Sequence, residues 1–170
     1  MSLKGFQKVG QYPSGADLQK PELHKYRGIL GPERFKELIR GVGLAAHGVG
    51  IGAFVYLRRT FESLIEEAHA VASKLQGWNE EQYEKSRMAE RISLLSHQLP
   101  PFLVANARLY SIMSTGVHEL TEEECLAHYE TVLASIEITL DQRLNEAEQA
   151  AKIKKVSAKI QTAQQTLDKP

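Results

Sequence analysis

The best-spaced candidate for metal chemistry lies early in the last third of the chain. His128 follows Cys125 by three residues and Glu124 by four, a spacing that places these side chains on one face of a helix. His118 lies just upstream, so the group offers metal ligands of mixed softness. The acidic residues 122–124, however, are explained by the positive N-terminus of a helix. We therefore expect no metal at this position.

A glycine-rich segment could bind phosphate. Residues 41–46, Gly-Val-Gly-Leu-Ala-Ala, fit the G-x-G-x-x-G/A fingerprint of dinucleotide-binding turns, and more glycines follow at positions 48, 50 and 52. The fingerprint requires a preceding strand, whereas the residues before it have helical spacing. The glycines are better explained by two helices that turn and approach each other, although backbone N–H groups at a helix start could still hold an anion. We expect no cofactor.

Arg58 and Arg59 lie about one to two turns before three acidic residues, Glu62, Glu66 and Glu67. Arg58 lies four residues before Glu62, so the two side chains can form an ion pair on one helix. A solvated pair of this kind stabilises a helix by only about 0.3 kcal/mol. Because the helix that carries it is predicted to be central, a partly buried pair with an orienting role is the second interpretation.

The composition indicates one soluble helical domain that positions these residues. A chain of 170 residues and 19.0 kDa has room for one core, and its 42% apolar and 25% charged residues exclude a disordered, fibrous or membrane-embedded class. The 21 basic and 21 acidic residues balance, which excludes the electrostatics of a typical nucleic-acid binder but not a local basic patch. A single cysteine forbids an internal disulfide, and the first residues do not resemble a signal peptide, so we expect a cytoplasmic protein.

Hydrophobic periodicity predicts an all-α antiparallel bundle. We expect helices at residues 21–27 with a stop at Gly28, from Gly31-Pro32 to a break near His47-Gly48, and at 49–76, 79–100 and 102–114. The helix at 49–76 is predicted to be central because its apolar residues recur at three and four positions: Phe54, Leu57, Phe61, Leu64, Ala68, Val71 and Leu75. The predicted divisions are an N-terminal arm with a short helix (1–30), a bundle (31–145) and a C-terminal helical extension (146–170).

The clearest helix start is the capping box Thr121-x-x-Glu124, and no glycine or proline follows it before residue 168. The turn at 116–118 before this helix is expected to be a hinge with His118 at least half buried. From Arg143 onward six Lys or Arg oppose three acidic residues, and an apolar stripe continues at Ile153, Val156, Ile160, Ala163 and Leu167. We expect this part to form a homo-oligomer or to bind a protein partner, with a frayed tail as the alternative.

Two segments carry a resemblance to known proteins. Residues 48–68 (GVGIGAFVYLRRTFESLIEEA) and 109–125 (LYSIMSTGVHELTEEEC) resemble a group of uncharacterised bacterial helical proteins whose plan is similar to the HEPN-like superfamily. The resemblance implies a helical bundle, often dimeric, of the kind found in nucleic-acid-processing, toxin and phage-defence proteins. It also implies that His118 is the motif histidine. The basic partner expected shortly before that histidine is absent from residues 110–117, and Arg108 is ten positions away.

Arg91 and His97 also resemble part of the HEPN ribonuclease signature, an arginine and a histidine separated by four to six residues. In such sites the histidine transfers a proton and the arginine clamps the phosphate during attack by the ribose 2′-hydroxyl. This pair lies in a different helix from the one that the family would use. The favoured alternative is a surface arginine and histidine near a helix end.

The sequence favours a binding or assembly protein without catalysis, because it combines no nucleophile, acid–base pair, metal set or phosphate loop in a convincing context. The alternative is a metal-independent ribonuclease of a toxin or phage-defence system, with His118 and either Arg58, Arg59 or Arg108 brought together by the fold; Arg91 and His97 are the second choice. RNA is then a possible partner, and no membrane is expected. The start at Met1-Ser2-Leu3 is compatible with removal of an upstream domain.

Overall fold

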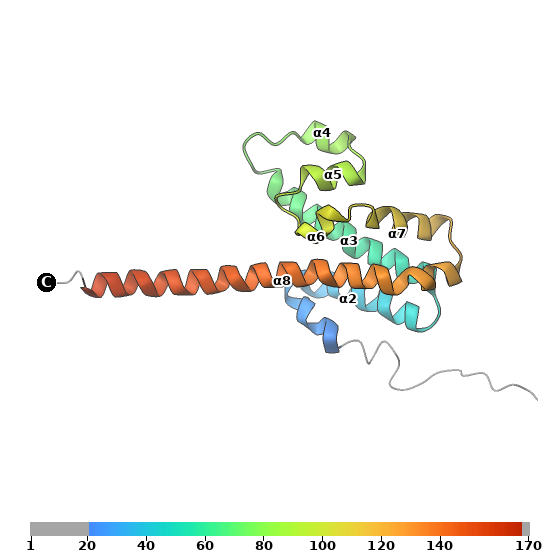
Figure 1. The fold of residues 1–170 in the computed structure, drawn as a ribbon, viewed down its shortest axis with the longest axis horizontal. Helices are drawn as coiled ribbons and strands as arrows, with labels where there is room; N and C mark the ends of the chain where they lie inside the picture. Colours follow the sequence, from blue (N-terminus) through green and yellow to red (C-terminus); the bar gives the residue numbers. More distant parts are fainter. Residues whose placement is uncertain (1–20, 168–170) are drawn as a thin grey trace, which may run out of the picture.

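The computed structural model describes residues 21–167, which form helices and no strand (Figure 1). This confirms the predicted all-α class with a long last helix. After a helical turn at 21–23 the order is η1 (His24–Tyr26), α2 (Arg27–Ala46), α3 (Gly50–Ala72), α4 (Glu80–Lys85), α5 (Met88–Leu94), α6 (Pro101–Ala105), α7 (Leu109–His118) and α8 (Glu122–Leu167). Residues 1–20 of the predicted N-terminal arm and the last three residues lie outside the described part.

α3 is the centre of the bundle and packs against α2, α7 and α8. Contacts of its two ends show that α3 runs parallel to α8 and antiparallel to α2 and α7. The first five residues of its predicted stripe are buried, whereas Val71 and Leu75 are 56% and 52% exposed. The stripe is therefore buried over a shorter length than predicted: Val71 is exposed in the last turn of α3, and Leu75 lies beyond the end of the helix at Ala72, four residues before the predicted end.

The N-terminal described residues belong to the bundle core. Leu23, Tyr26 and Leu30 are buried, and the Tyr26 hydroxyl donates to Asp141 Oδ1 (3.0 Å) in α8. The predicted stop at Gly28 is wrong, because the helix continues to Gly31, whose φ of 73° breaks the helical path before Pro32. The predicted break near His47-Gly48 is confirmed, and Gly48 there has a φ of 80°.

Residues 79–105 form short helices over the C-terminal end of α3 (Figure 1). Asn79 caps α4 as expected, and its side chain accepts from the Gln82 N–H (3.0 Å). The single helix predicted over 79–100 is nevertheless two helices, because Ser86 and Arg87 have extended backbone angles. The helix predicted over 102–114 is likewise divided into α6 and α7.

α7 continues through the predicted hinge. Gly116 is a buried helical residue, and a Cβ at this position would overlap the ring of Phe54 in α3. The glycine therefore allows two helices to approach closely, and the hinge prediction is wrong. The chain turns three residues later, where Thr121 caps α8: its Oγ1 accepts from the Glu124 N–H (3.2 Å), and Glu124 Oε2 accepts from the Thr121 N–H (2.9 Å).

α8 covers the bundle with its first half and projects beyond it with its second half (Figure 1). Val132, Leu133, Ile136 and Leu140 are buried, whereas every residue from Asn145 to Thr166 is exposed. The first half thus completes the core, and the second half has no contact with the rest of the described chain that shields it from solvent. Among the described residues no helix is both long enough and apolar enough to cross a membrane.

Candidate functional site

His118 lies at the exposed C-terminal end of α7. The prediction that it is at least half buried is wrong, because the helix extends to this residue and turns its side chain into solvent. Within the described residues it makes no hydrogen bond or ion pair that would orient its ring. The candidate histidine is therefore accessible but not held in place.

Arg58 belongs to a three-residue polar cluster between α3 and α7. Its Nε donates to Glu62 Oε1 (2.9 Å), and its Nη2 donates to the Tyr110 hydroxyl (2.9 Å). The Tyr110 hydroxyl in turn donates to Glu62 Oε1 (3.0 Å). The bond to Glu62 raises the pKa of Arg58, and burial raises the pKa of Tyr110, so both groups keep their protons. The predicted Arg58–Glu62 pair is present and partly buried, and Tyr110 is the partner that sequence reasoning missed.

The fold does not unite His118 with the arginines proposed for it. Tyr110, which holds Arg58, precedes His118 by eight residues of α7, or about 12 Å at 1.5 Å per residue. Arg59 instead pairs with Glu37 of α2 (3.2 Å). Arg108 lies before α7, at the opposite end of that helix from His118.

Arg91 has a structural role at the end of α4. Its Nε donates to the carbonyl oxygens of Tyr83 (3.1 Å) and Ser86 (3.0 Å), and its Nη2 donates to that of Glu84 (3.0 Å). These bonds satisfy carbonyl groups that a helix C-terminus leaves unpaired. His97 is exposed in the turn after α5. The guanidinium is thus occupied by the backbone and is not directed at a site shared with His97.

The suggested metal ligands have other partners. Cys125 is buried and its Sγ donates to the Gly116 carbonyl oxygen (3.2 Å), while burial raises the pKa of the thiol. Glu124 is part of the capping box, and the Thr121 N–H lowers the pKa of its carboxyl group. Within residues 21–167 no group of three His, Cys, Asp or Glu is arranged to hold a metal ion.

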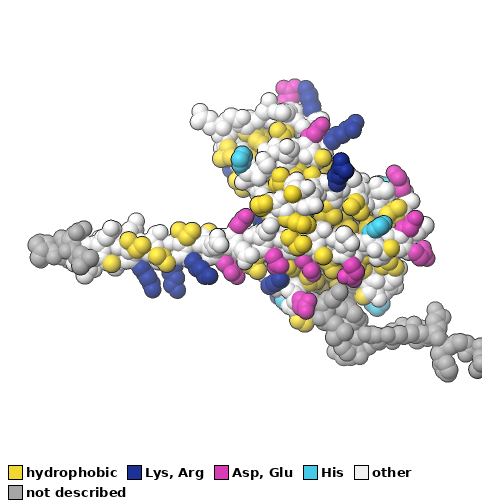
Figure 2. All heavy atoms as spheres, viewed as in Figure 1, with side chains coloured by type: hydrophobic (Ala, Val, Ile, Leu, Met, Phe, Trp, Pro, Cys, Tyr) yellow, Lys and Arg dark blue, Asp and Glu magenta, His cyan; other side chains and the backbone are white. Residues whose placement is uncertain are grey.

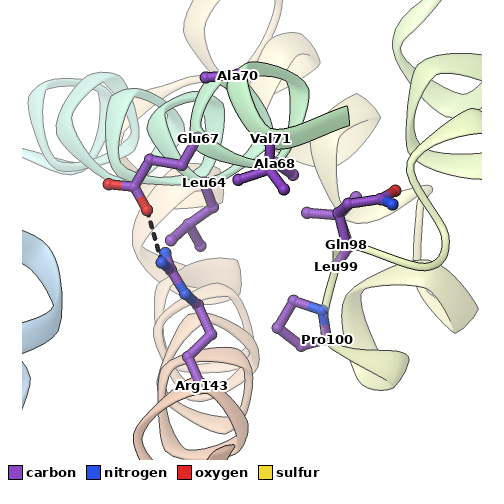
Figure 3. Close-up of a pocket in the computed structure, with 9 residues that line it drawn as sticks. All are labelled: Leu64, Glu67, Ala68, Ala70, Val71, Gln98, Leu99, Pro100 and Arg143. Carbon is purple, nitrogen blue, oxygen red and sulfur yellow. Dashed lines mark ion pairs between the residues drawn. The ribbon is translucent and has the colours of Figure 1, made fainter. Parts of the chain in front are cut away.

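A cavity of about 340 Å³ lies between α3, the segment after α5, and α8 (Figure 3). Most of its lining is apolar, and its polar lining residues are Glu67, Gln98 and Arg143. Arg143 Nη2 contacts Glu67 Oε2 (2.6 Å), and Glu67 also pairs with Arg34 of α2. Arg143 Nη1 is buried and has no hydrogen-bond partner among the described residues. The cavity therefore has an apolar wall and one guanidinium that is already paired with a carboxylate.

Sequence reasoning did not identify this network of Glu67 with two arginines. One signal was available: Arg143 is the only Lys or Arg among residues 122–148, a stretch with eight acidic residues. A lone basic residue in such a stretch indicates a specific partner. The partner itself, 76 positions earlier, could be found only from the packing of α3 against α8.

The second half of α8 is exposed along its length in the described part of the chain. We name residues 149–167 the α8 extension. Ile153, Val156 and Ile160 in this segment are 67%, 54% and 53% exposed, and they lie along one stripe of the helix. Figure 2 shows hydrophobic side chains and a row of basic groups on the projecting helix. The extension contains four lysines and no acidic residue.

The molecule thus belongs to the class of all-α bundles, with a helical extension as its distinctive feature. Comparisons with protein families, with curated proteins and with solved structures find no match. The HEPN-like resemblance therefore stays a hypothesis.

Proposed function

We propose that this protein is a non-catalytic binding or assembly protein that associates with another protein through the α8 extension. The observation that carries the proposal is the exposed stripe of Ile153, Val156 and Ile160 on a helix that leaves the bundle. Isolated helices of this length are marginal in water, and a stripe of aliphatic side chains gains stability when another surface covers it. A protein partner supplies such a surface.

Binding of RNA explains fewer of these residues. The four lysines of the extension could contact phosphate groups, which is how basic helices bind nucleic acid. Three exposed aliphatic side chains have no role in a phosphate contact. A protein interface uses both the apolar stripe and the charges beside it.

The proposal is tested with two pairs of substitutions in the full chain. Val156→Asp with Ile160→Asp places two charges on the apolar stripe. Ala158→Asp with Gln161→Asp adds the same charge on the opposite side of the helix and is the matched control. All four positions are exposed, so the bundle is expected to keep its thermal stability in both variants.

The two readouts are molar mass by light scattering and capture of proteins from extracts of the native host. We expect the chain either to exceed 19.0 kDa in solution or to capture a defined protein. The stripe variant should lose that association, and the control variant should keep it. A monomeric chain that captures nothing, or an association that both variants retain, would contradict the proposal.

A further inference from the structure

The two halves of α8 carry opposite charge. Residues 122–148 contain eight acidic side chains and one arginine. The charged residues of the extension are all lysines, at positions 152, 154, 155 and 159. The helix is continuous from Glu122 to Leu167 and cannot fold back to bring its own halves together. The lysines of the extension therefore cannot pair with the acidic residues in the first half of the same helix.

The opposite charges also lie along one side of the helix. At 100° per residue, Glu130, Asp141 and Glu148 fall within about 60° of Lys152, Lys155 and Lys159. Figure 2 shows acidic groups along the lower edge of α8 within the bundle and basic groups along the same edge of the projecting part. The exposed apolar side chains lie next to this charged row in both halves: Ile138 in the first (43% exposed), and Val156 and Ile160 in the second.

Resting on the proposed assembly function, we infer that the partner of the α8 extension is a second copy of this chain, packed antiparallel along α8. In antiparallel helix pairs the same flank of each helix faces the other, so the acidic row of one copy meets the basic row of the other. A parallel pair would instead place acidic residues level with acidic residues and lysines level with lysines. A foreign partner would leave the acidic row and Ile138 without a role.

The spacing of the charges places the two-fold axis near residue 150. Residues equally distant from this point then lie opposite each other, which pairs Glu148 with Lys152 of the second copy and Asp141 with Lys159 of the second copy. In the same register Ile138 falls opposite Thr162 of the second copy, two residues or about 3 Å along the helix from Ile160. Asp141 already contacts Lys25 (2.6 Å), but its side chain is 45% exposed and has room for a second cation.

Two sets of variants of the full chain test the inference by light scattering. Lys152→Glu places like charges opposite each other and is expected to weaken the dimer at least tenfold, more strongly at low salt. Adding Glu148→Lys to that variant restores opposite charges, and the dimer is expected to return. Failure of the second substitution to restore association would overturn the pairing.

Cysteine cross-linking then decides the direction of the helices. Cys125 is buried, so the unmodified chain is the unreactive control. Two Gln149→Cys side chains lie beside the proposed axis and should form a disulfide under mild oxidation. Two Ala163→Cys side chains would be separated by about 39 Å along the antiparallel pair and should not. Cross-links at both positions would indicate a parallel pair and overturn the inference.

These experiments distinguish a wrong partner from a wrong assembly function. A monomeric chain without a cross-link at either position overturns the second copy as partner. If that chain still captures a host protein, and the stripe variant loses it, the assembly function stands with a foreign partner. If it captures nothing, both the inference and the assembly function are wrong.

Discussion

At the scale of single residues, Arg58 and Arg91 each have several hydrogen-bond partners, whereas Arg59 has one exposed ion pair. Arg58 is held by Glu62 and Tyr110, Arg59 by Glu37, and Arg91 by backbone carbonyl oxygens. Charged side chains with several fixed hydrogen-bond partners stabilise the packing of helices and change position only when those partners move. Their geometry therefore favours a structural role for Arg58 and Arg91.

Gly116 is expected to tolerate no larger side chain. In Gly116→Ala the added Cβ overlaps the Phe54 ring, and overpacking of this kind costs about 1–3 kcal/mol of unfolding free energy. Gly43→Ala is the matched control, because no atom lies within 4 Å of a Cβ placed there and alanine favours a helix by up to about 1 kcal/mol. Urea denaturation should show opposite shifts for the two variants, and equal shifts would contradict the close approach of α7 and α3.

Thr121→Ala is expected to cost about 1 kcal/mol, because it removes the side-chain oxygen that accepts from the Glu124 N–H. Thr131→Ala makes the same chemical change at an exposed position inside α8 and should leave stability nearly unchanged. The melting midpoints of the two variants give the comparison. An unchanged midpoint in Thr121→Ala would show that the cap contributes nothing.

At the scale of elements, periodicity predicted those helices whose start and length are determined by local sequence. α8 has a capping box and an uninterrupted run, and both its start and its length were predictable. The break between α4 and α5 was not, because the hydrogen bonds that hold it come from a side chain of the following helix. Arg91 bonds to carbonyl groups five to eight residues away in the preceding helix.

The candidate site was less predictable than the helices. His118 was placed correctly before α8, but its exposure depends on α7 continuing past Gly116, and that continuation depends on the Phe54 ring in another helix. The exposed stripe of the extension was visible in the sequence as the apolar spacing that continues from Ile153 to Leu167. Whether other helices cover such a stripe depends on how far the bundle extends along α8. The apolar spacing alone does not predict that extent.

Glu67 of α3 is expected to stabilise the packing of α2, α3 and α8, because it pairs with Arg34 of α2 and Arg143 of α8. Glu67→Gln leaves a partly buried guanidinium without its anion and should cost on the order of 2 kcal/mol. Glu37→Gln removes the partner of Arg59, which is 57% exposed, and should cost less than about 1 kcal/mol. Chemical denaturation measures both, and equal losses would show that Glu67 has no special role.

At the scale of the whole molecule, the separation of His118 from the arginines leads us to expect no cleavage of single-stranded RNA above background. Proton transfer and phosphate stabilisation require both groups within reach of one phosphate. The assay compares the purified full chain with His118→Ala and with His97→Ala. Cleavage that disappears only in His118→Ala would establish the ribonuclease alternative, and cleavage that disappears only in His97→Ala would move the site to Arg91 and His97.

The contact between Tyr26 and Asp141 has a consequence for the order in which the protein folds. These residues are 115 positions apart, so the bundle cannot close during synthesis until most of the chain has left the ribosome. The hairpin of α2 and α3 forms from local contacts and is complete much earlier. Until α8 arrives, the side of α3 that will face it remains open to solvent. Newly made chains therefore pass through a stage in which apolar side chains of α3 lack the cover that α8 later provides.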